Sequence, residues 1–436
     1  MFDRLLFRFS SGIRLIKSQY YLLDFLWNHC FIINMKVYKV LYLIVVFAIG
    51  CSSDKQSKYI LPSIDIRKEY SEKEMALTDI ADITYVHLNS QNSDYVYGGG
   101  VKYITENSIV VIDVSSGSVL FFSKDGNPKS RINHYGQGPE EYSSANFFIT
   151  YDEKEDDLYV IVPGYTGASG HSTKIYSSTG EYKRTLILPA CPMPLVDFDD
   201  HSLFVYDMQY QYEKMMKAEE YFSSRLIDSS IYRISKKDGK VLEYVEYPIT
   251  EVDIVDKGNG SRSTSSFQRI INCDAGLFLC NPESDTVFLY GKDKTLTPVI
   301  CKFPLINDLS PKIMLTGFCD IGRYQYIKVE PLTSIFDDIP PTERYKALVK
   351  HYIRNKQTGE IFRQKISLPD YKGKDFFLES YNTYFNGKET MTYFSLDIYE
   401  LKQADKENKL SGKLKELVTT LNENEDNNVY VLATFK

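Results

Sequence analysis

Short strand–turn–strand units recur along the chain and limit what it can fold into. The clearest unit runs from Ser108 to Ile132, where three runs rich in Val, Ile, Leu and Phe are separated by turns at SSG and KDGN. β-Branched and aromatic residues favour strands, and Gly and Asn tolerate the positive φ that tight turns require. The pattern therefore predicts short antiparallel strands joined by tight turns.

Units of the same kind follow, with about 40 to 65 residues between equivalent turns, as expected for propeller blades with insertions. They lie at 157–189, 229–248, 277–304 and 345–369, and a less regular copy lies between Asp375 and the C-terminus. Each blade of a propeller is a four-stranded antiparallel sheet. We predict an all-β, six-bladed β-propeller over residues 79–436.

The two ends of this region each carry a short alternating strand. These strands are Asp82–Ser90 and Asn427–Lys436. Pairing them in one blade would close the ring and remove an exposed sheet edge. Two short helical insertions are expected as well, one at Met208–Leu226 in the third blade and one from about Ser411 to Leu421.

A separate signal precedes the strand-rich region. In MKVYKVLYLIVVFAIGC (Met35–Cys51), two lysines come before a ten-residue apolar run that ends in AIGC. A run of this length is too short to span a bilayer, which takes roughly 20 residues, and the ending is typical of a lipoprotein cleavage box. We predict a signal peptide at 35–50, a lipid on Cys51 and an anchor linker at 51–78. Residues 1–34 are interpreted as an upstream extension with Met35 as the true start.

This interpretation sets the location and the partners. The protein would be an outer-membrane lipoprotein, attached through Cys51 and facing the periplasm or the cell surface. The chain carries a formal net charge of −7. An acidic chain without a basic patch repels phosphates, so no nucleic-acid partner is expected.

Four segments together resemble a known family. They are the AIGC box, YGQGPEEY (Tyr135–Tyr142), NPESDTVFLY (Asn281–Tyr290) and the NNVYVLATFK ending. The chain is similar in these features to the six-bladed β-propeller lipoproteins of Bacteroidetes, which have NHL-like blades. The resemblance implies a propeller fold and a cell-envelope location, and it assigns no catalytic residue.

The glycine-rich segment GQGPEEY could suggest a phosphate-binding loop. It lacks the Lys and Ser/Thr that follow in a P-loop, so a rigid turn between the first two blades is the favoured interpretation. If the segment faces the central channel instead, its polar and aromatic side chains are ligand-binding candidates: His134, Tyr135, Gln137 and Glu140.

No catalytic or metal-binding motif stands out. The histidines are isolated, and several aspartates are scattered where strands are expected to end, which favours solvated turn residues: Asp113, Asp197, Asp199, Asp207, Asp274 and Asp285. Cys273 and Cys280 could pair across a hairpin, but free thiols are favoured. No cofactor is expected.

The sequence thus favours a lipid-anchored binding or interaction module whose ligand is a glycan, a peptide or a partner protein. Exposed tyrosines suit such sites, because they present a flat apolar face with a polar tip. The alternative is a metal-dependent hydrolase or lactonase on the same propeller. That alternative requires three or four Asp, Glu, Asn or His side chains that converge at the mouth of the channel.

Overall fold

The computed structural model describes residues 61–90, 93–142, 148–162, 171–188, 192–207, 229–248, 269–281, 284–310, 312–331, 348–422 and 427–436. The expected upstream extension, the signal peptide, Cys51 and the helical insertion at Met208–Leu226 lie outside these ranges. Residues Leu61–Lys436 form one compact unit.

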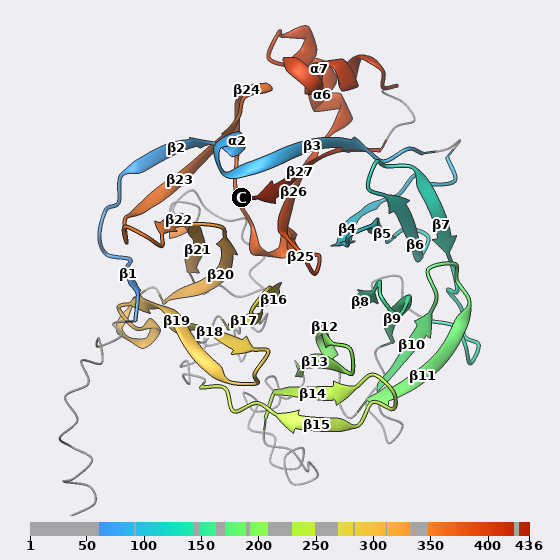
Figure 1. Ribbon diagram of the computed structural model, residues 1–436. Coiled ribbons are helices and arrows are strands. Elements are labelled where there is room, and N and C mark those ends of the chain that lie inside the picture. The colour runs from blue at the N-terminus through green and yellow to red at the C-terminus, as the bar shows by residue number, and fades with distance from the viewer. Residues whose placement is uncertain are drawn as a thin grey trace, which may run out of the picture. The chain divides into compact units, whose positions relative to one another are not determined.

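Six antiparallel sheets form a ring around a central axis (Figure 1), which confirms the predicted six-bladed propeller. The first sheet is β4 (Gly99–Ile104), β5 (Ser108–Asp113), β6 (Ser118–Ser123) and β7 (Pro128–Ile132). The second is β8 (Phe148–Asp152), β9 (Asp157–Val162), β10 (His171–Tyr176) and β11 (Tyr182–Leu188). The third is β12 (Pro192–Asp199), β13 (Ser202–Asp207), β14 (Ile231–Ser235) and β15 (Val241–Tyr244).

The remaining three sheets follow in the same order along the chain. The fourth contains β16 (Arg269–Cys273), β17 (Gly276–Cys280), β18 (Thr286–Gly291) and β19 (Leu296–Phe303). The fifth contains β20 (Ile313–Ile321), β21 (Tyr324–Pro331), β22 (Lys350–Asn355) and β23 (Ile361–Leu368). The sixth contains β25 (Thr383–Phe385), β26 (Thr390–Leu396), β27 (Val429–Phe435) and β3 (Ala81–His87).

The sixth sheet joins strands from both ends of the propeller region. β27 pairs with β3 in antiparallel register from Val429 opposite His87 to Phe435 opposite Ala81. These are the two strands that the sequence suggested for ring closure. β27 therefore lies in the interior of its sheet, between β26 and β3.

Part of the segment expected to be a linker contributes to the sheets instead. β1 (Ser63–Asp65) pairs in parallel with β19, and β2 (Glu72–Ala76) pairs in parallel with β23. A further strand, β24 (Tyr371–Phe376), also pairs with β23. The N-terminal strands thus cover the outer edges of the fourth and fifth sheets.

Helices are few and short in the described ranges. α2 (Leu77–Ile80) leads into β3, and two 3₁₀ turns lie at Ile306–Asp308 and Ser380–Asn382. α7 (Gly412–Thr419) confirms the helix expected near Ser411–Leu421. α6 (Ile398–Lys406) was not expected, although Asp397 caps it by accepting a hydrogen bond from the Glu400 backbone N–H.

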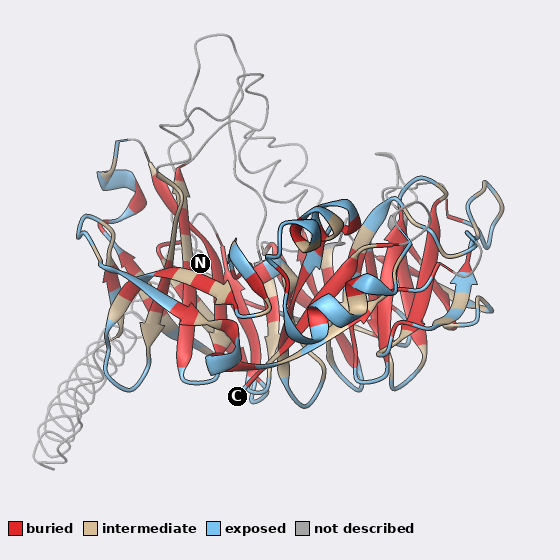
Figure 2. Ribbon diagram, turned by 90° about the horizontal axis from the view of Figure 1, so that it is seen from above, coloured by how far each residue is buried: buried red, intermediate tan, exposed pale blue. Residues whose placement is uncertain are grey.

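The core lies between neighbouring sheets, and most of the buried residues are in the strands (Figure 2). Every residue of β5 and β13 is buried, because a blade is covered on both faces. Between the first and second sheets, Ile112 and Phe121 pack with Leu158 and Tyr176. Aromatic side chains suit these interfaces, since each buries a large area.

Candidate functional site

The strand nearest the axis in each sheet is β4, β8, β12, β16, β20 or β25 (Figure 1). Because these strands run in the same direction, the hairpins that follow them open on one face of the ring. A cavity of about 580 Å³ lies among these hairpins. It is lined by residues 103–107, 151–154, 197–198, 272–273, 276–277 and 384–387, and by Lys292.

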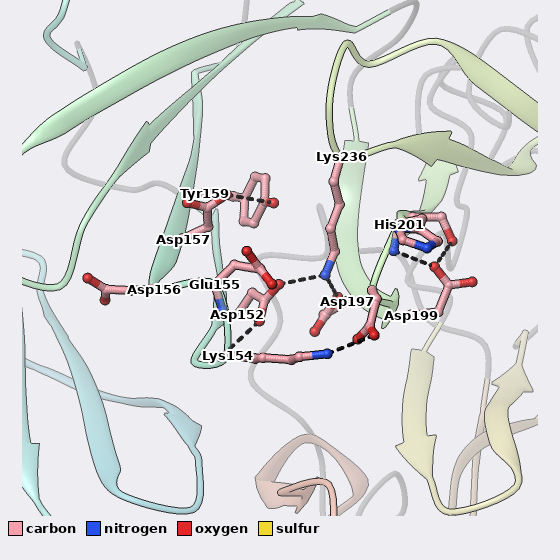
Figure 3. Close-up of polar contacts among 12 residues, drawn as sticks. Asp152, Lys154, Glu155, Asp156, Asp157, Tyr159, Asp197, Asp199, His201 and Lys236 are labelled. Carbon is pink, nitrogen blue, oxygen red and sulfur yellow. Dashed lines mark hydrogen bonds and ion pairs between the residues drawn. The ribbon is translucent and has the colours of Figure 1, made fainter.

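A buried lysine joins two aspartates beside this cavity (Figure 3). Lys236 Nζ lies 2.6 Å from Asp152 Oδ2 and 2.7 Å from Asp197 Oδ1. The side chains of Lys236 and Asp152 are only 9 % and 5 % exposed, whereas that of Asp197 is 32 % exposed. Both aspartates line the cavity, and Asp197 is the more exposed of the two.

Local backbone hydrogen bonds hold the cluster in place. Asp152 ends β8, and its Oδ1 accepts hydrogen bonds from the backbone N–H groups of Lys154 and Glu155, which leaves Oδ2 for Lys236. Lys236 follows β14, and its backbone N–H donates to the carbonyl of His201. The cluster thus ties the second sheet to the third.

Burial and charge oppose each other at Asp197. Burial raises the pKa of Asp197 to about 6, although the ammonium of Lys236 favours the ionised carboxylate. Burial also acts to lower the pKa of Lys236, but Asp197 and Asp152 outweigh it, so that this pKa lies above its ordinary value. Lys236 therefore stays charged at neutral pH, while Asp197 titrates near pH 6.

Aromatic rings form the apolar part of the wall. Tyr103 and Tyr384 lie with ring centroids 6.1 Å apart, and Phe198 follows Asp197 directly in β12. Asn272 on β16 donates from Nδ2 to the backbone carbonyl of Asp197 at 3.3 Å. Flat apolar surfaces thus alternate with amide and carboxylate groups around the cavity.

The rim of the cavity is held by further polar contacts. Glu153 accepts hydrogen bonds from Thr105 Oγ1 at 2.7 Å and from the backbone N–H of Asn107 at 3.2 Å, which links the first two hairpins. The hairpin after β16 turns at Gly276, whose φ of +143° suits glycine. A Cβ there would lie 2.1 Å from the carbonyl oxygen of Tyr290.

None of the four ligand-binding candidates lines this cavity. His134 stacks on Tyr176 with ring centroids 4.7 Å apart, and its Nε2 lies 2.7 Å from the carbonyl of Gly180. Tyr135 is 55 % exposed, and Gln137 and Glu140 are exposed as well. The segment joins β7 to β8 as an inter-blade connection, and ligand binding by these residues stays a prediction.

Of the six aspartates that the sequence placed at strand ends, one lines the cavity and five do not. Asp197 reaches the cavity, although the sequence favoured a solvated turn residue at this position. Asp113 and Asp199 bind turn residues, for example Ser115 and Ser202, with their carboxylates. The others lie apart from the cavity lining: Asp207 ends β13 and is buried, Asp274 is exposed, and Asp285 lies 2.7 Å from Lys302 Nζ.

Cys273 and Cys280 are both free thiols, as favoured from the sequence. The β16–β17 register places Cys273 opposite Gly276 and Cys280 opposite Arg269, so the two cysteines lie at opposite ends of the hairpin. Cys273 lines the cavity, and burial raises the pKa of its thiol to about 11. The thiol is therefore protonated at neutral pH and is a poor nucleophile.

Within the described ranges, no three His, Cys, Asp or Glu side chains are grouped so that they could hold a metal ion. At the point where Asp152 and Asp197 converge, the ammonium of Lys236 occupies the place of a cation. Among the helices that the structure describes, none is long and apolar enough to cross a membrane.

The family model described as "Domain of unknown function (DUF4934)" matches residues 61–434. No functionally curated protein matches the sequence. Among solved structures, a Bacteroides fragilis NCTC 9343 protein described as exported is similar, with a TM-score of 0.57 and 15 % identity over 86 % of this chain and 100 % of that one.

Two other solved structures show weaker likeness. A member of the DUF4221 family from Bacteroides vulgatus ATCC 8482 has a TM-score of 0.44 and 12 % identity, over 82 % of this chain and 97 % of that one. Virginiamycin B lyase from Staphylococcus aureus has a TM-score of 0.35 and 11 % identity, over 81 % and 99 %. At these identities the likeness to the Bacteroides fragilis protein concerns the fold alone.

Proposed function

The chain belongs to the DUF4934 family, and we propose that it is a ligand-binding module of the cell envelope whose binding site is the axial cavity. The observation that carries this proposal is the cavity itself. Its volume of about 580 Å³ falls within the range of small-molecule sites, roughly 300–1,000 Å³. Its wall combines aromatic rings with a few polar groups, as such sites commonly do.

The fixed side chains around the cavity favour recognition over covalent chemistry. Asp152 and Asp197 are held by Lys236, and the one cysteine in the lining is a protonated thiol. A saccharide unit or a short peptide segment fits this wall, because both present hydroxyl or amide groups beside apolar surface. A partner protein could insert such a segment into the cavity.

The alternative of a metal-dependent hydrolase or lactonase has less support. Two carboxylates converge beside the cavity, fewer than the three or four ligands that this function requires, and a lysine ammonium already neutralises part of their charge. A metal ion at this point would have to displace Lys236 against its two ion pairs. We therefore prefer the binding role.

Placement in the envelope rests on the sequence and on one relative. The AIGC box ending at Cys51 is typical of lipoproteins, and the similar Bacteroides fragilis protein is described as exported. We propose lipid attachment at Cys51 in the outer membrane. Metabolic labelling with palmitate would test it, because the label should appear in the wild type and be lost in Cys51→Ser.

The binding role is tested by a thermal-shift screen of the full chain with glycans, short peptides and envelope extracts. A ligand at 100 times its Kd stabilises a protein by about 2.7 kcal/mol, which is readily seen as a shift of the unfolding midpoint. We expect at least one class of compound to raise the midpoint. No shift with any class would contradict the proposal.

A further inference from the structure

The charges around the cavity do not balance. The lining contains four carboxylates and two lysines: Glu106, Asp152, Glu153, Asp197, Lys154 and Lys292. Lys154 lies 2.7 Å from Asp200, and Lys292 lies 3.4 Å from Asp274, so aspartates outside the lining neutralise both. Two further lysines then face the four carboxylates: Lys236, which pairs with Asp152 and Asp197, and Lys124, which lies near Glu153. The cavity is therefore electronegative, and it favours a cationic ligand.

Asp197 is the carboxylate best placed to meet such a ligand. Its Oδ1 is buried and lies 2.7 Å from Lys236 Nζ, yet the side chain is 32 % exposed. The accessible part of the carboxylate is therefore on the side of Oδ2. Lys236 fixes the orientation of the carboxylate and is held in turn by Asp152. The exposed oxygen is thus positioned before any ligand arrives, which lowers the cost of binding.

The aromatic wall suits a cation as well. Tyr103, Tyr384 and Phe385 are partly exposed and line the cavity. Aromatic rings attract cations through their electron-rich faces, most strongly when the cation is removed from water. A carboxylate beside several aromatic rings is therefore a favourable setting for a protonated amine.

Resting on the proposed function of this cavity, we propose that its ligand carries a protonated amine and that Asp197 is the counter-ion of that amine. The amine of an amino sugar and the amino terminus of a peptide share this chemistry. Lys236 acts as a positioning residue that orients Asp197. Glu106, which is exposed at the rim, adds longer-range attraction.

The test compares probes that differ by one charge. Isothermal titration at pH 7.0 measures glucosamine against N-acetylglucosamine, and triglycine against N-acetyltriglycine, with the full chain. We expect at least one amine to bind more than tenfold more tightly than its acetylated partner. The two pairs distinguish a sugar source from a peptide source.

Two variants test whether Asp197 is the carboxylate that binds the amine. Asp197→Asn should weaken the preferred amine at least tenfold and abolish its advantage over the acetylated probe. Asp82→Asn removes the same charge from an 81 % exposed side chain whose partner, Lys436, also lies outside the lining, and it should change binding less than twofold. Circular dichroism checks that both variants are folded.

The pH dependence of the wild type gives a readout that needs no variant. The groups around Asp197 that bear on its titration are Asp152, Lys236, Asp199 and Tyr103. Because the pKa of Asp197 is about 6, amine binding should be about five- to tenfold weaker at pH 5.0 than at pH 7.0. Binding of the acetylated probe should change little.

Each outcome decides the inference. Selective amine binding that is lost in Asp197→Asn and weakened at low pH supports it. Equal binding of amine and acetylated probes overturns it, while the proposed binding function stands. If neither glucosamine nor triglycine binds, the inference is also overturned. The proposed binding function is then tested separately by the thermal-shift screen.

Discussion

Lys236 Nζ lies 2.6 Å from Asp152 Oδ2, and this ion pair joins residues 84 positions apart in the sequence. Asp152 ends the inner strand of the second sheet, and Lys236 lies in the outer hairpin of the third. Both side chains are nearly inaccessible to solvent. The pair therefore links two blades at the edge of the axial cavity.

Replacing this lysine should be costly for stability. Lys236→Met leaves two aspartates without their cation, and breaking a buried pair in this way costs about 3–5 kcal/mol. Urea unfolding of the full chain measures the loss. Lys154→Met is the matched control: its pair with Asp200 is 65 % and 62 % exposed, and such a surface pair contributes less than about 1 kcal/mol. Equal losses in the two variants would contradict this description.

A second buried pair lies in the fourth blade. Lys302 is fully buried, and its Nζ lies 2.7 Å from Asp285 Oδ1 and donates to the Pro304 carbonyl at 2.6 Å. Asp285→Asn would leave the ammonium without a counter-ion and should lower the free energy of unfolding by about 3–5 kcal/mol. Asp274→Asn, at an exposed pair, should lower it by less than about 1 kcal/mol. A loss below 1 kcal/mol in Asp285→Asn would show that the pair is not buried in solution.

The sequence predicts the features that depend on local interactions and misses those that depend on contacts between residues far apart in the chain. The six blades follow from local features, because strand-forming runs and glycine turns repeat along the chain. The site depends on contacts between blades: Asp152, Asp197 and Lys236 carry no local sign of their meeting, and an aspartate at a strand end usually binds its own turn, as Asp199 does.

The N-terminal strands β1 and β2 could not be predicted from the sequence for the same reason. β1 and β2 are short, and their parallel partners in β19 and β23 lie more than 200 residues away in the sequence. A signal for α6 was present, however, because Asp397 and Glu400 have the spacing of a capping pair. The helix could therefore have been predicted from its first four residues.

His351 should make the fold sensitive to acid. Burial lowers the pKa of His351 to about 4, and the nearby Lys328 adds to the shift. In the unfolded chain this histidine is protonated below about pH 6.5, whereas in the folded chain it stays neutral down to about pH 4. The free energy of unfolding therefore falls as the pH drops from 6.5 toward 4. We expect His351→Gln to lose about 2–3 kcal/mol less than the wild type between pH 7.5 and pH 4.5. Thermal unfolding at both pH values measures this, and identical losses would contradict the burial of the ring.

The pairing of β3 with β27 can be tested with proline. Ala433 is fully buried in β27, between two strands, and lies opposite Ile83. Ala433→Pro removes a ladder hydrogen bond and should cost about 3 kcal/mol or more in urea unfolding. Tyr399→Pro is the control, because proline is tolerated in the first turn of a helix such as α6. A mild effect of Ala433→Pro would contradict the pairing.

The most direct test of the account is whether a ligand occupies the axial cavity. Phe385 lines it, whereas Tyr399 is 71 % exposed on α6, outside the lining. Tryptophan fluorescence of Phe385→Trp and Tyr399→Trp, with the wild type as background, is measured while a compound that raises the unfolding midpoint is added. A saturable change in Phe385→Trp alone is the predicted result. A stabilising compound that leaves Phe385→Trp unchanged would place the binding site elsewhere and contradict the account.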